Sequence, residues 1–443
     1  RLNIGGDNPV RVQSMTTTST LDTEGSVAQC KRIIDAGGEL VRLTTQGRRE
    51  AENLANISRQ LRAEGYTQPL CADIHFNANV ADVAACHTEK VRINPGNYVD
   101  PARTFKHLEY TDEQYAQELE KIEERLTTFI DLCKEHHTAV RIGVNHGSLS
   151  DRIMSRYGDT PEGIVESCME FLRIFRKHNF DDVVISIKAS NTVVMVRSVR
   201  LLVAEMDRED MHYPLHLGVT EAGEGEDGRI KSAVGIGALL ADGIGDTIRV
   251  SLSEEPEAEI PVAKHLVRYI RRKQGHLLVP GVQAKNFDYL RPERRKTQAV
   301  GPIGGTQPPV VIVSEVQGAK EGVTQGQEAL RPDYIYVGQQ MPDLPVEGQR
   351  YIVDFNAFGR ELQKHMDVAD YMFPIFPYNA MPYISAVPDT APIFLVLPYG
   401  SCAEEYKACL KANPNVVVVV PSQHQNRLGE QRALVHELMA EGV

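Results

Sequence analysis

The chain has 443 residues and a formal net charge of −12 at neutral pH, with 42% apolar and 24% charged residues. This acidic balance argues against a general nucleic-acid binder, because phosphate contacts need a basic surface. No apolar run approaches the roughly 20 residues of a membrane-spanning helix, and no signal-peptide pattern opens the chain. We therefore expect no nucleic-acid or membrane partner. The chain begins with Arg1 rather than Met, so we expect a processed or trimmed piece.

The cysteines point to a reducing compartment. They are Cys30, Cys71, Cys86, Cys133, Cys168, Cys402 and Cys409. Their number is odd, their spacing is scattered and no Cys-x-x-Cys pair occurs, so neither a disulfide framework nor a closed zinc site is indicated. We expect a cytoplasmic protein whose own side chains bind no metal.

Short β-rich runs alternate with amphipathic helical stretches over the first 265 residues. The predicted strands are residues 10–15, 39–43, 70–74, 90–94, 139–144, 182–188, 215–219 and 247–252. The stretches between them include a helix over residues 24–36 and a long helix that a capping box opens at Thr111. This alternation indicates parallel βαβ units. Eight such units in about 260 residues predict a closed (β/α)8 TIM barrel.

The composition changes after about residue 265, where Gly and Pro become frequent and a basic run occupies residues 291–296. We expect a TIM-barrel substrate-binding domain over residues 1–270, a linker over 271–308 and a second α/β domain over 309–443. Strands of this second domain are predicted at residues 310–314, 334–337, 350–354, 392–397 and 416–420. Its sheet is either open and doubly wound or an incomplete barrel.

Five of the eight predicted barrel strands carry a cation at or near their C-terminal end. These cations are Arg42, Arg92, Arg141, Lys188 and Arg249. The C-terminal ends of barrel strands share one rim, where we find only Asp73 and Glu221 to oppose them. An uncompensated buried charge costs several kcal/mol, and guanidinium groups match phosphate oxygens in bidentate fashion. We therefore predict a small phosphorylated substrate, preferably a diphosphate, over a set of structural ion pairs.

Acid–base candidates stand at the same strand ends. They are Asp73, His75 and Glu221, and cations nearby favour the ionised form of a carboxylate. Glu221, at a junction of strand and loop, is the first choice for proton transfer, whereas His75 serves equally well as an orienting hydrogen-bond donor. Neutral donors suited to an oxygen-rich ligand are Asn94, Asn145, Thr220 and Ser251.

Residues 223–228 match the spacing of a dinucleotide-binding loop, Gly-x-Gly-x-x-Gly. Three carboxylates within these six residues would repel a pyrophosphate that the backbone must approach closely. We therefore reject nucleotide binding here and predict a flexible acidic loop at the active site.

Seven segments of the first 265 residues carry a joint resemblance. They are residues 5–16, 40–43 (LVRL), 72–76 (ADIHF), 92–97 (RINPGN), 141–145 (RIGVN), 215–223 and 245–251 (GDTIRVS). Together they resemble the 4-hydroxy-3-methylbut-2-enyl diphosphate synthase family of the non-mevalonate isoprenoid pathway, in its plant-like, three-domain type. In that type an insert domain separates the barrel from an iron–sulfur domain.

The resemblance implies an oxidoreductase that acts on CH or CH2 groups. Its barrel would bind 2-C-methyl-D-erythritol 2,4-cyclodiphosphate, open the ring reductively and remove a hydroxyl as water. The diphosphate would be held by Arg42, Arg92, Arg141, Lys188 and Arg249, with Asn145, Thr220 and Ser251 assisting. The reacting carbons would be lined by Asp73, Asn94 and Glu221.

The reaction needs two electrons, which no side chain can deliver, so a cofactor must supply them. The resemblance implies a [4Fe–4S] cluster held by three cysteines and a glutamate in a C-terminal domain, with ferredoxin or flavodoxin as the electron donor. The Cys-x-x-Cys signature of such a domain is absent, and the chain stops at Val443 where it would follow. We expect barrel plus insert domain, which bind the substrate without turning it over.

Two other functions fit parts of the pattern. Lys188 at the end of a barrel strand suits a Schiff-base aldolase, although the density of arginines around it fits anion binding better. A non-catalytic phospholigand-binding protein, with the second domain as output, is the other alternative. The sequence leaves the electron donor, the oligomeric state and the role of the insert domain open.

Overall fold

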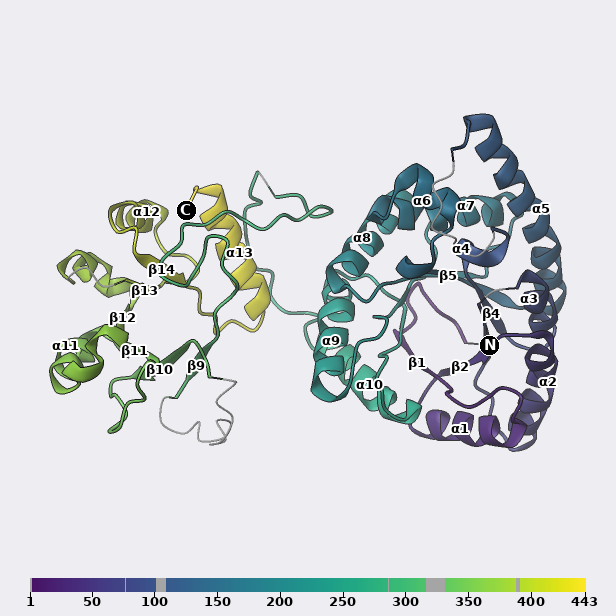
Figure 1. Cartoon of the computed structure of the whole chain (residues 1–443), viewed down its shortest axis with the longest axis horizontal. Coiled ribbons are helices and arrows are strands. Elements are labelled where there is room, and N and C mark those ends of the chain that lie inside the picture. The colour runs from purple at the N-terminus through teal and green to yellow at the C-terminus, as the bar shows by residue number, and fades with distance from the viewer. Residues whose placement is uncertain (1, 76, 101–108, 286, 316–330, 388–390) are drawn as a thin grey trace. The chain divides into compact units, whose positions relative to one another are not determined.

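The computed structural model describes residues 2–75, 77–100, 109–285, 287–315, 331–387 and 391–443. The chain divides into two compact units, Arg1–Gln274 and Gly275–Val443. Figure 1 shows helices around a ring of strands in the first unit and helices beside a second sheet in the other. Both units have the α/β architecture that the alternation of strands and helices predicts.

Eight parallel strands form the barrel of the first unit. They are β1 (Arg11–Met15), β2 (Leu40–Thr45), β3 (Leu70–Ile74), β4 (Lys90–Ile93), β5 (Ala139–Asn145), β6 (Val183–Lys188), β7 (His216–Leu217) and β8 (Thr247–Ile248). Their order is β6-β5-β4-β3-β2-β1-β8-β7. A parallel bridge between Ile185 and Leu215 joins the two ends of this order, so the predicted TIM barrel is confirmed. The last two strands are shorter than predicted.

Among the described residues of this unit, ten helices follow or connect the strands. They are α1 (Thr23–Asp35), α2 (Arg48–Ala63), α3 (Ala78–Ala85), α4 (Pro95–Tyr98), α5 (Asp112–His136), α6 (Asp151–Tyr157), α7 (Pro161–Lys177), α8 (Thr192–Arg208), α9 (Gly225–Ala241) and α10 (Glu259–Arg271). The predicted capping box at Thr111 is present: its hydroxyl accepts from the backbone N–H of Gln114, whose side chain accepts from the backbone N–H of Thr111.

The predicted acidic loop at residues 223–228 is wrong in its extent, because α9 already begins at Gly225. Glu226 and Asp227 lie in the first turn of this helix. Carboxylates are stabilising there, since the N-terminus of a helix carries a partial positive charge. The motif therefore contributes a helix start rather than a flexible loop.

Strand side chains alternate between an apolar outer face and a polar barrel interior. Val91 and Ile93 of β4 belong to the apolar core between strands and helices. Lys90 and Arg92 alternate with them, and both are buried. Branched aliphatic side chains usually fill the interior of a TIM barrel. A barrel interior with buried cations therefore needs negatively charged or hydrogen-bond-accepting groups that compensate the positive charge.

The described residues of the second unit form a sheet of six parallel strands. They are β9 (Ile312–Ser314), β10 (Tyr334–Gly338), β11 (Arg350–Asp354), β12 (Met372–Phe376), β13 (Ile393–Val396) and β14 (Val416–Val419), with α11 (Phe355–Lys364), α12 (Ala403–Ala412) and α13 (Arg427–Ala440) beside them. The strands lie in chain order. A doubly wound sheet would reverse this order at a switch point, so the incomplete barrel is the correct alternative. Sequence analysis missed β12, which contains Pro374.

A buried ion-pair network fixes the loops beyond β4 and β5. Arg152 of α6 donates to both carboxylate oxygens of Glu170, at 2.9 and 2.8 Å, and to Asp100 at 3.1 Å. The hydroxyl of Tyr115 also donates to Glu170. Arg152 and Glu170 are 3% and 4% exposed, so neither charge can be compensated by water.

In the described part of the chain, no helix has the length and apolar character that a membrane span requires.

Replacing Glu170 with alanine should destabilise the barrel by about 3 kcal/mol, because it leaves the buried guanidinium of Arg152 with Asp100 alone. Urea unfolding followed by far-UV circular dichroism measures this, since the chain contains no tryptophan. Glu118→Ala is the matched control, because Glu118 pairs with Lys121 at the surface, where ion pairs contribute little. Equal midpoints for the two variants would contradict the role of the network.

Candidate functional site

A cavity of about 260 Å³ lies at the C-terminal ends of the barrel strands. Its lining residues are Arg42, Asp73, His75, Arg92, Asn94, Asn97, Arg141, Asn145, Ser148, Lys188, Val219, Thr220, Arg249 and Ser251. Sequence analysis predicted most of these residues, and missed Asn97, Ser148 and Val219. Of the predicted site residues, only Glu221 is outside this lining.

Parallel register brings the charged side chains of neighbouring strands to one level. Asp73 of β3 lies opposite Arg92 of β4, and Arg92 lies opposite Arg141 of β5. Further along, Asn145 lies opposite Lys188 of β6. Successive strands of a barrel therefore present a continuous row of polar groups to the cavity.

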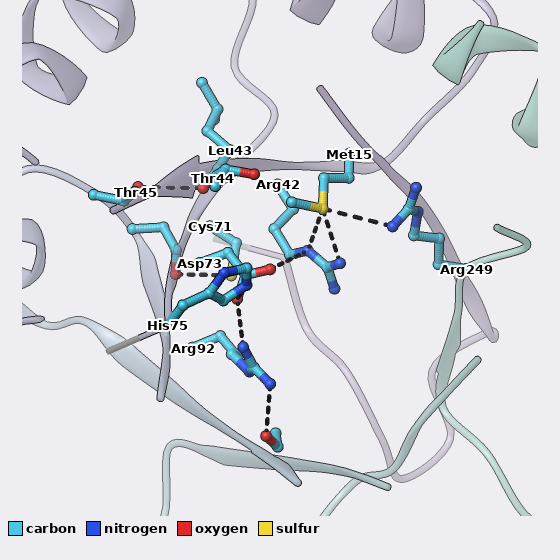
Figure 2. A network of polar contacts seen from close by, with 12 residues as sticks. Met15, Arg42, Leu43, Thr44, Thr45, Cys71, Asp73, His75, Arg92 and Arg249 are labelled. Atoms are coloured by element: carbon cyan, nitrogen blue, oxygen red, sulfur yellow. Dashed lines mark hydrogen bonds and ion pairs between the residues drawn. The ribbon is translucent and has the colours of Figure 1, made fainter. Parts of the chain in front are cut away.

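Asp73 is the acceptor for two guanidinium groups (Figure 2). Its carboxylate oxygens lie 3.0 Å from Nε of Arg42 and 3.0 Å from Nη1 of Arg92, and His75 Nε2 is 3.6 Å away. Burial opposes the ionised form, but Arg42 and Arg92 outweigh it and hold the pKa of Asp73 well below its usual range. Asp73 is therefore held as a carboxylate between the two arginines.

Two glycines make room for cations in the barrel interior. Nη2 of Arg92 donates to the carbonyl oxygen of Gly143 at 2.8 Å, and a Cβ on Gly143 would lie 2.3 Å from Nε of Arg92. A Cβ on Gly218 would lie 3.2 Å from Nζ of Lys188. A side chain at Gly143 of β5 would displace Arg92, whereas one at Gly218, directly after β7, would need Lys188 to shift by a few tenths of an ångström.

Arg249 has a carboxylate partner that sequence analysis missed. Nε and Nη2 of Arg249 donate to the two oxygens of Glu259, each at 3.0 Å. Glu259 also accepts from the Ser14 hydroxyl at 2.6 Å and from the backbone N–H of Leu252 at 3.2 Å. The expectation that only Asp73 and Glu221 oppose the rim cations is therefore wrong. The only sequence signal was a carboxylate at the start of the helix that follows the eighth strand.

Positive charge nevertheless remains in excess at the cavity. Among the described residues, buried donors without a hydrogen-bond partner include Nη1 of Arg42 and both Nε and Nη1 of Arg141. Burial, followed by repulsion from Arg42, lowers the pKa of Arg141. Burial and the charges of Arg42, Arg141 and Arg249 hold the pKa of Lys188 well below its usual range. An anion with several negative charges would satisfy these donors together.

A neutral wall connects the loops beyond β4 and β5. Nδ2 of Asn94 donates to the hydroxyl of Ser148 at 2.9 Å, and this hydroxyl donates to the carbonyl oxygen of Asn145 at 3.2 Å. The Asn94 side chain also accepts from the backbone N–H of Gly96. These contacts orient amide and hydroxyl groups beside the cations, where they can bind uncharged oxygens of a ligand.

The structure does not bring Glu221 into the cavity. It is exposed and takes a left-handed backbone conformation with a φ of 52°, which is uncommon for a residue other than glycine. Its neighbour Thr220 lines the cavity, and the Thr220 hydroxyl is buried without a partner among the described residues. The strained turn therefore presents Thr220 to the cavity while the side chain of Glu221 lies outside it.

The cysteines do not fit an iron–sulfur cluster. All seven lie in the described part of the chain, where no three Cys, His, Asp or Glu side chains form a group that could hold a metal ion. Burial raises the pKa of Cys30 to about 12 and also raises the pKa values of Cys133 and Cys168. Since thiolates are the ligands of such clusters, these side chains suit an apolar core instead.

Comparison with known proteins gives one consistent family. The GcpE TIM-barrel domain family matches residues 1–264. The 4-hydroxy-3-methylbut-2-en-1-yl diphosphate synthase (flavodoxin) of Bacteroides thetaiotaomicron is 61% identical over 440 residues, which are 99% of this chain and 70% of that protein. The protein of the same name from Phocaeicola vulgatus is 62% identical over 441 residues, again 99% of this chain and 70% of the relative. A dihydropteroate synthase structure from Xanthomonas albilineans aligns with a TM-score of 0.39 and 14% identity over 60% of this chain and 94% of its own.

The chain should take up protons when it binds inorganic pyrophosphate at a pH between the lowered pKa of Lys188 in the free protein and the ordinary pKa of a lysine. A bound anion favours the ammonium form of Lys188, so it raises a pKa that burial and three arginines lower in the free protein. Titration calorimetry in two buffers of different ionisation enthalpy measures the uptake. Lys188→Met should abolish it, whereas Lys121→Met at the surface should not. Undiminished proton uptake in the Lys188→Met variant would show that Lys188 is not the group that gains the proton.

Proposed function

This chain belongs to the GcpE family of 4-hydroxy-3-methylbut-2-en-1-yl diphosphate synthases, and from that premise we propose that its rim cavity binds the diphosphate of the substrate. The family's step is the oxidoreductase conversion of 2-C-methyl-D-erythritol 2,4-cyclodiphosphate to 4-hydroxy-3-methylbut-2-en-1-yl diphosphate in isoprenoid biosynthesis. The observation that carries the proposal is the excess of buried, unpartnered cationic donors around a cavity of about 260 Å³.

The cations divide into two groups by the partners that they already have. Arg42, Arg92 and Arg249 are oriented by carboxylates, so they offer their remaining N–H groups from fixed positions. Arg141 has unpartnered donors on its buried guanidinium, and Lys188 gains a proton most readily beside an anion. We assign the strongest diphosphate contacts to Arg141 and Lys188. These two cations have no carboxylate partner among the described residues, so the negative charge of a bound diphosphate compensates the most positive charge there. Supporting neutral donors would be Asn145, Thr220 and Ser251.

Removal of a hydroxyl as water requires a proton at the departing oxygen. His75 lines the cavity 3.6 Å from Asp73, so its ring can be oriented by that carboxylate while it faces the substrate. Asn94 would bind a substrate oxygen on the opposite wall. Glu221 remains a proposal for proton transfer that requires its side chain to turn toward the cavity from the adjoining loop.

The two electrons must come from a group that these residues do not hold. A [4Fe–4S] cluster would supply them when bound, and the described side chains of this chain offer no cysteine set for it. The names of both relatives include flavodoxin, so we propose flavodoxin as the electron donor in preference to ferredoxin. A cytoplasmic location, where such donors work, is proposed on the same ground.

The lowered pKa of Lys188 is the property that a Schiff-base lysine needs. Family membership nevertheless favours reductive ring opening over aldol chemistry. The surrounding arginines also account for the lowered pKa without a carbonyl substrate. We therefore assign Lys188 to diphosphate binding.

Replacing Arg141 with alanine should weaken binding of the cyclodiphosphate by about 2 kcal/mol, which is roughly thirtyfold in Kd. The physical reason is the loss of a charge-assisted, desolvated contact. Titration calorimetry of the 443-residue chain measures this change. Arg48→Ala is the control, since this arginine is 77% exposed and pairs with Glu52 on a helix surface. An unchanged Kd in the Arg141 variant would remove the rim from substrate binding.

Iron and acid-labile sulfide analysis should find no stoichiometric cluster on this chain after anaerobic reconstitution. Its cysteines are scattered, and burial raises the pKa values of several of them. The same preparation should bind the cyclodiphosphate, which shows that it is folded. A count of roughly four irons per chain would refute the expectation.

A further inference from the structure

Seven of the eight barrel strands, or the segments directly after them, contribute a residue to the cavity, whereas β1 contributes none. Strand β1 lies between β8 and β2. It therefore separates Arg249, which follows β8, from Arg42 of β2. The residue of β1 at this level is Met15, which lies in register with Arg42. The gap in the ring of cavity residues is thus occupied by a methionine between two arginines.

The thioether sulfur of Met15 contacts both guanidinium groups (Figure 2). Nη2 and Nε of Arg42 lie 2.9 and 3.1 Å from Sδ, and Nη1 of Arg249 lies 3.5 Å from it. The two guanidiniums approach one acceptor from opposite sides of the strand. Sulfur therefore holds a position between two like charges that repel each other.

The chemistry of a thioether suits this position. A methionine sulfur accepts weakly, donates nothing and carries no charge. A carboxylate in its place would accept more strongly, but it would also cancel positive charge that the cavity needs. A leucine would remove this acceptor from Nη2 of Arg42 and Nη1 of Arg249, whereas Nε of Arg42 would keep Asp73. Methionine thus orients two arginines while it leaves their charge undiminished.

We propose that Met15 is a positioning residue for the diphosphate site, which acts through Arg42 and Arg249 by accepting hydrogen bonds from both without neutralising either. The inference rests on the proposed function of the cavity. Asp73 lies 3.0 Å from Nε of Arg42, which also contacts Met15, and Glu259 accepts from Nε and Nη2 of Arg249. Without Met15, Nη2 of Arg42 and Nη1 of Arg249 lose this acceptor, and the guanidinium that carries the unpartnered Nη1 of Arg42 is held less firmly.

Titration of four proteins with inorganic pyrophosphate at constant ionic strength tests this inference. The 443-residue chain is compared with Met15→Leu, which removes the acceptor, and with Met15→Gln, which restores a neutral acceptor. Met206→Leu is the matched control, because Met206 is buried in the core at 3% exposure, away from the cavity. We expect Met15→Leu to weaken binding roughly three- to tenfold, and Met15→Gln and the control to stay within about twofold of wild type.

Met15→Glu provides a second arm, because glutamate and glutamine share a shape and differ in charge. We expect Met15→Glu to bind pyrophosphate at least about tenfold more weakly than Met15→Gln, since its carboxylate neutralises the facing arginines. Thermal unfolding in the absence of pyrophosphate verifies that each variant is folded. This arm keeps the inference testable if Met15→Leu does not fold.

The outcomes separate two failures. If the wild-type chain does not bind pyrophosphate, the proposed function of the cavity fails. If wild type binds and Met15→Leu binds equally well, the role of Met15 is overturned while the site stands. Equal binding by Met15→Gln and Met15→Leu, or by Met15→Gln and Met15→Glu, likewise overturns it, because shape rather than the neutral acceptor then decides affinity.

Discussion

Buried positive charge at one end of the barrel is the constraint on which the site depends. Five cations line a cavity in which Asp73 is the only lining carboxylate among the described residues. Each additional buried cation costs more than the previous one, because its neighbours repel it as well as burial. The pKa of Lys188 is lowered because burial and the neighbouring arginines disfavour its charged form. The site is therefore assembled in a state that favours a multivalent anion over water.

Three acceptors of different strength limit that cost without removing it. Asp73 bridges Arg42 and Arg92, Glu259 holds Arg249, and Met15 offers a neutral sulfur between Arg42 and Arg249. None of them pairs with Arg141 or Lys188. The two carboxylates thus orient Arg42, Arg92 and Arg249, while Arg141 and Lys188 stay available. This division gives fixed geometry together with a net positive charge, which a fully paired ring could not provide.

Strand-end chemistry was predictable from the sequence because parallel topology places all C-terminal strand ends on one rim. That rule found the cations, Asp73 and the neutral donors without any knowledge of distances. It could not find Glu259 or Met15, since one acts from the following helix and the other from a strand that contributes nothing to the cavity lining. The start of α9 at Gly225 was also missed, because helix-terminal carboxylates and acidic loops have the same composition.

The charge that prepares the site also couples stability to pH and to the ligand. In the folded chain the pKa of Lys188 lies well below its usual range, so the unfolded chain binds more protons between the two values. The contribution of this group to the free energy of unfolding therefore rises as pH increases through that window. A bound diphosphate raises the folded pKa again and removes this dependence, since the ammonium then has a partner. The same cations therefore strengthen diphosphate binding and destabilise the free chain. Substituting an arginine that lacks a carboxylate partner would consequently weaken diphosphate binding and relieve the repulsion among cations in the free barrel.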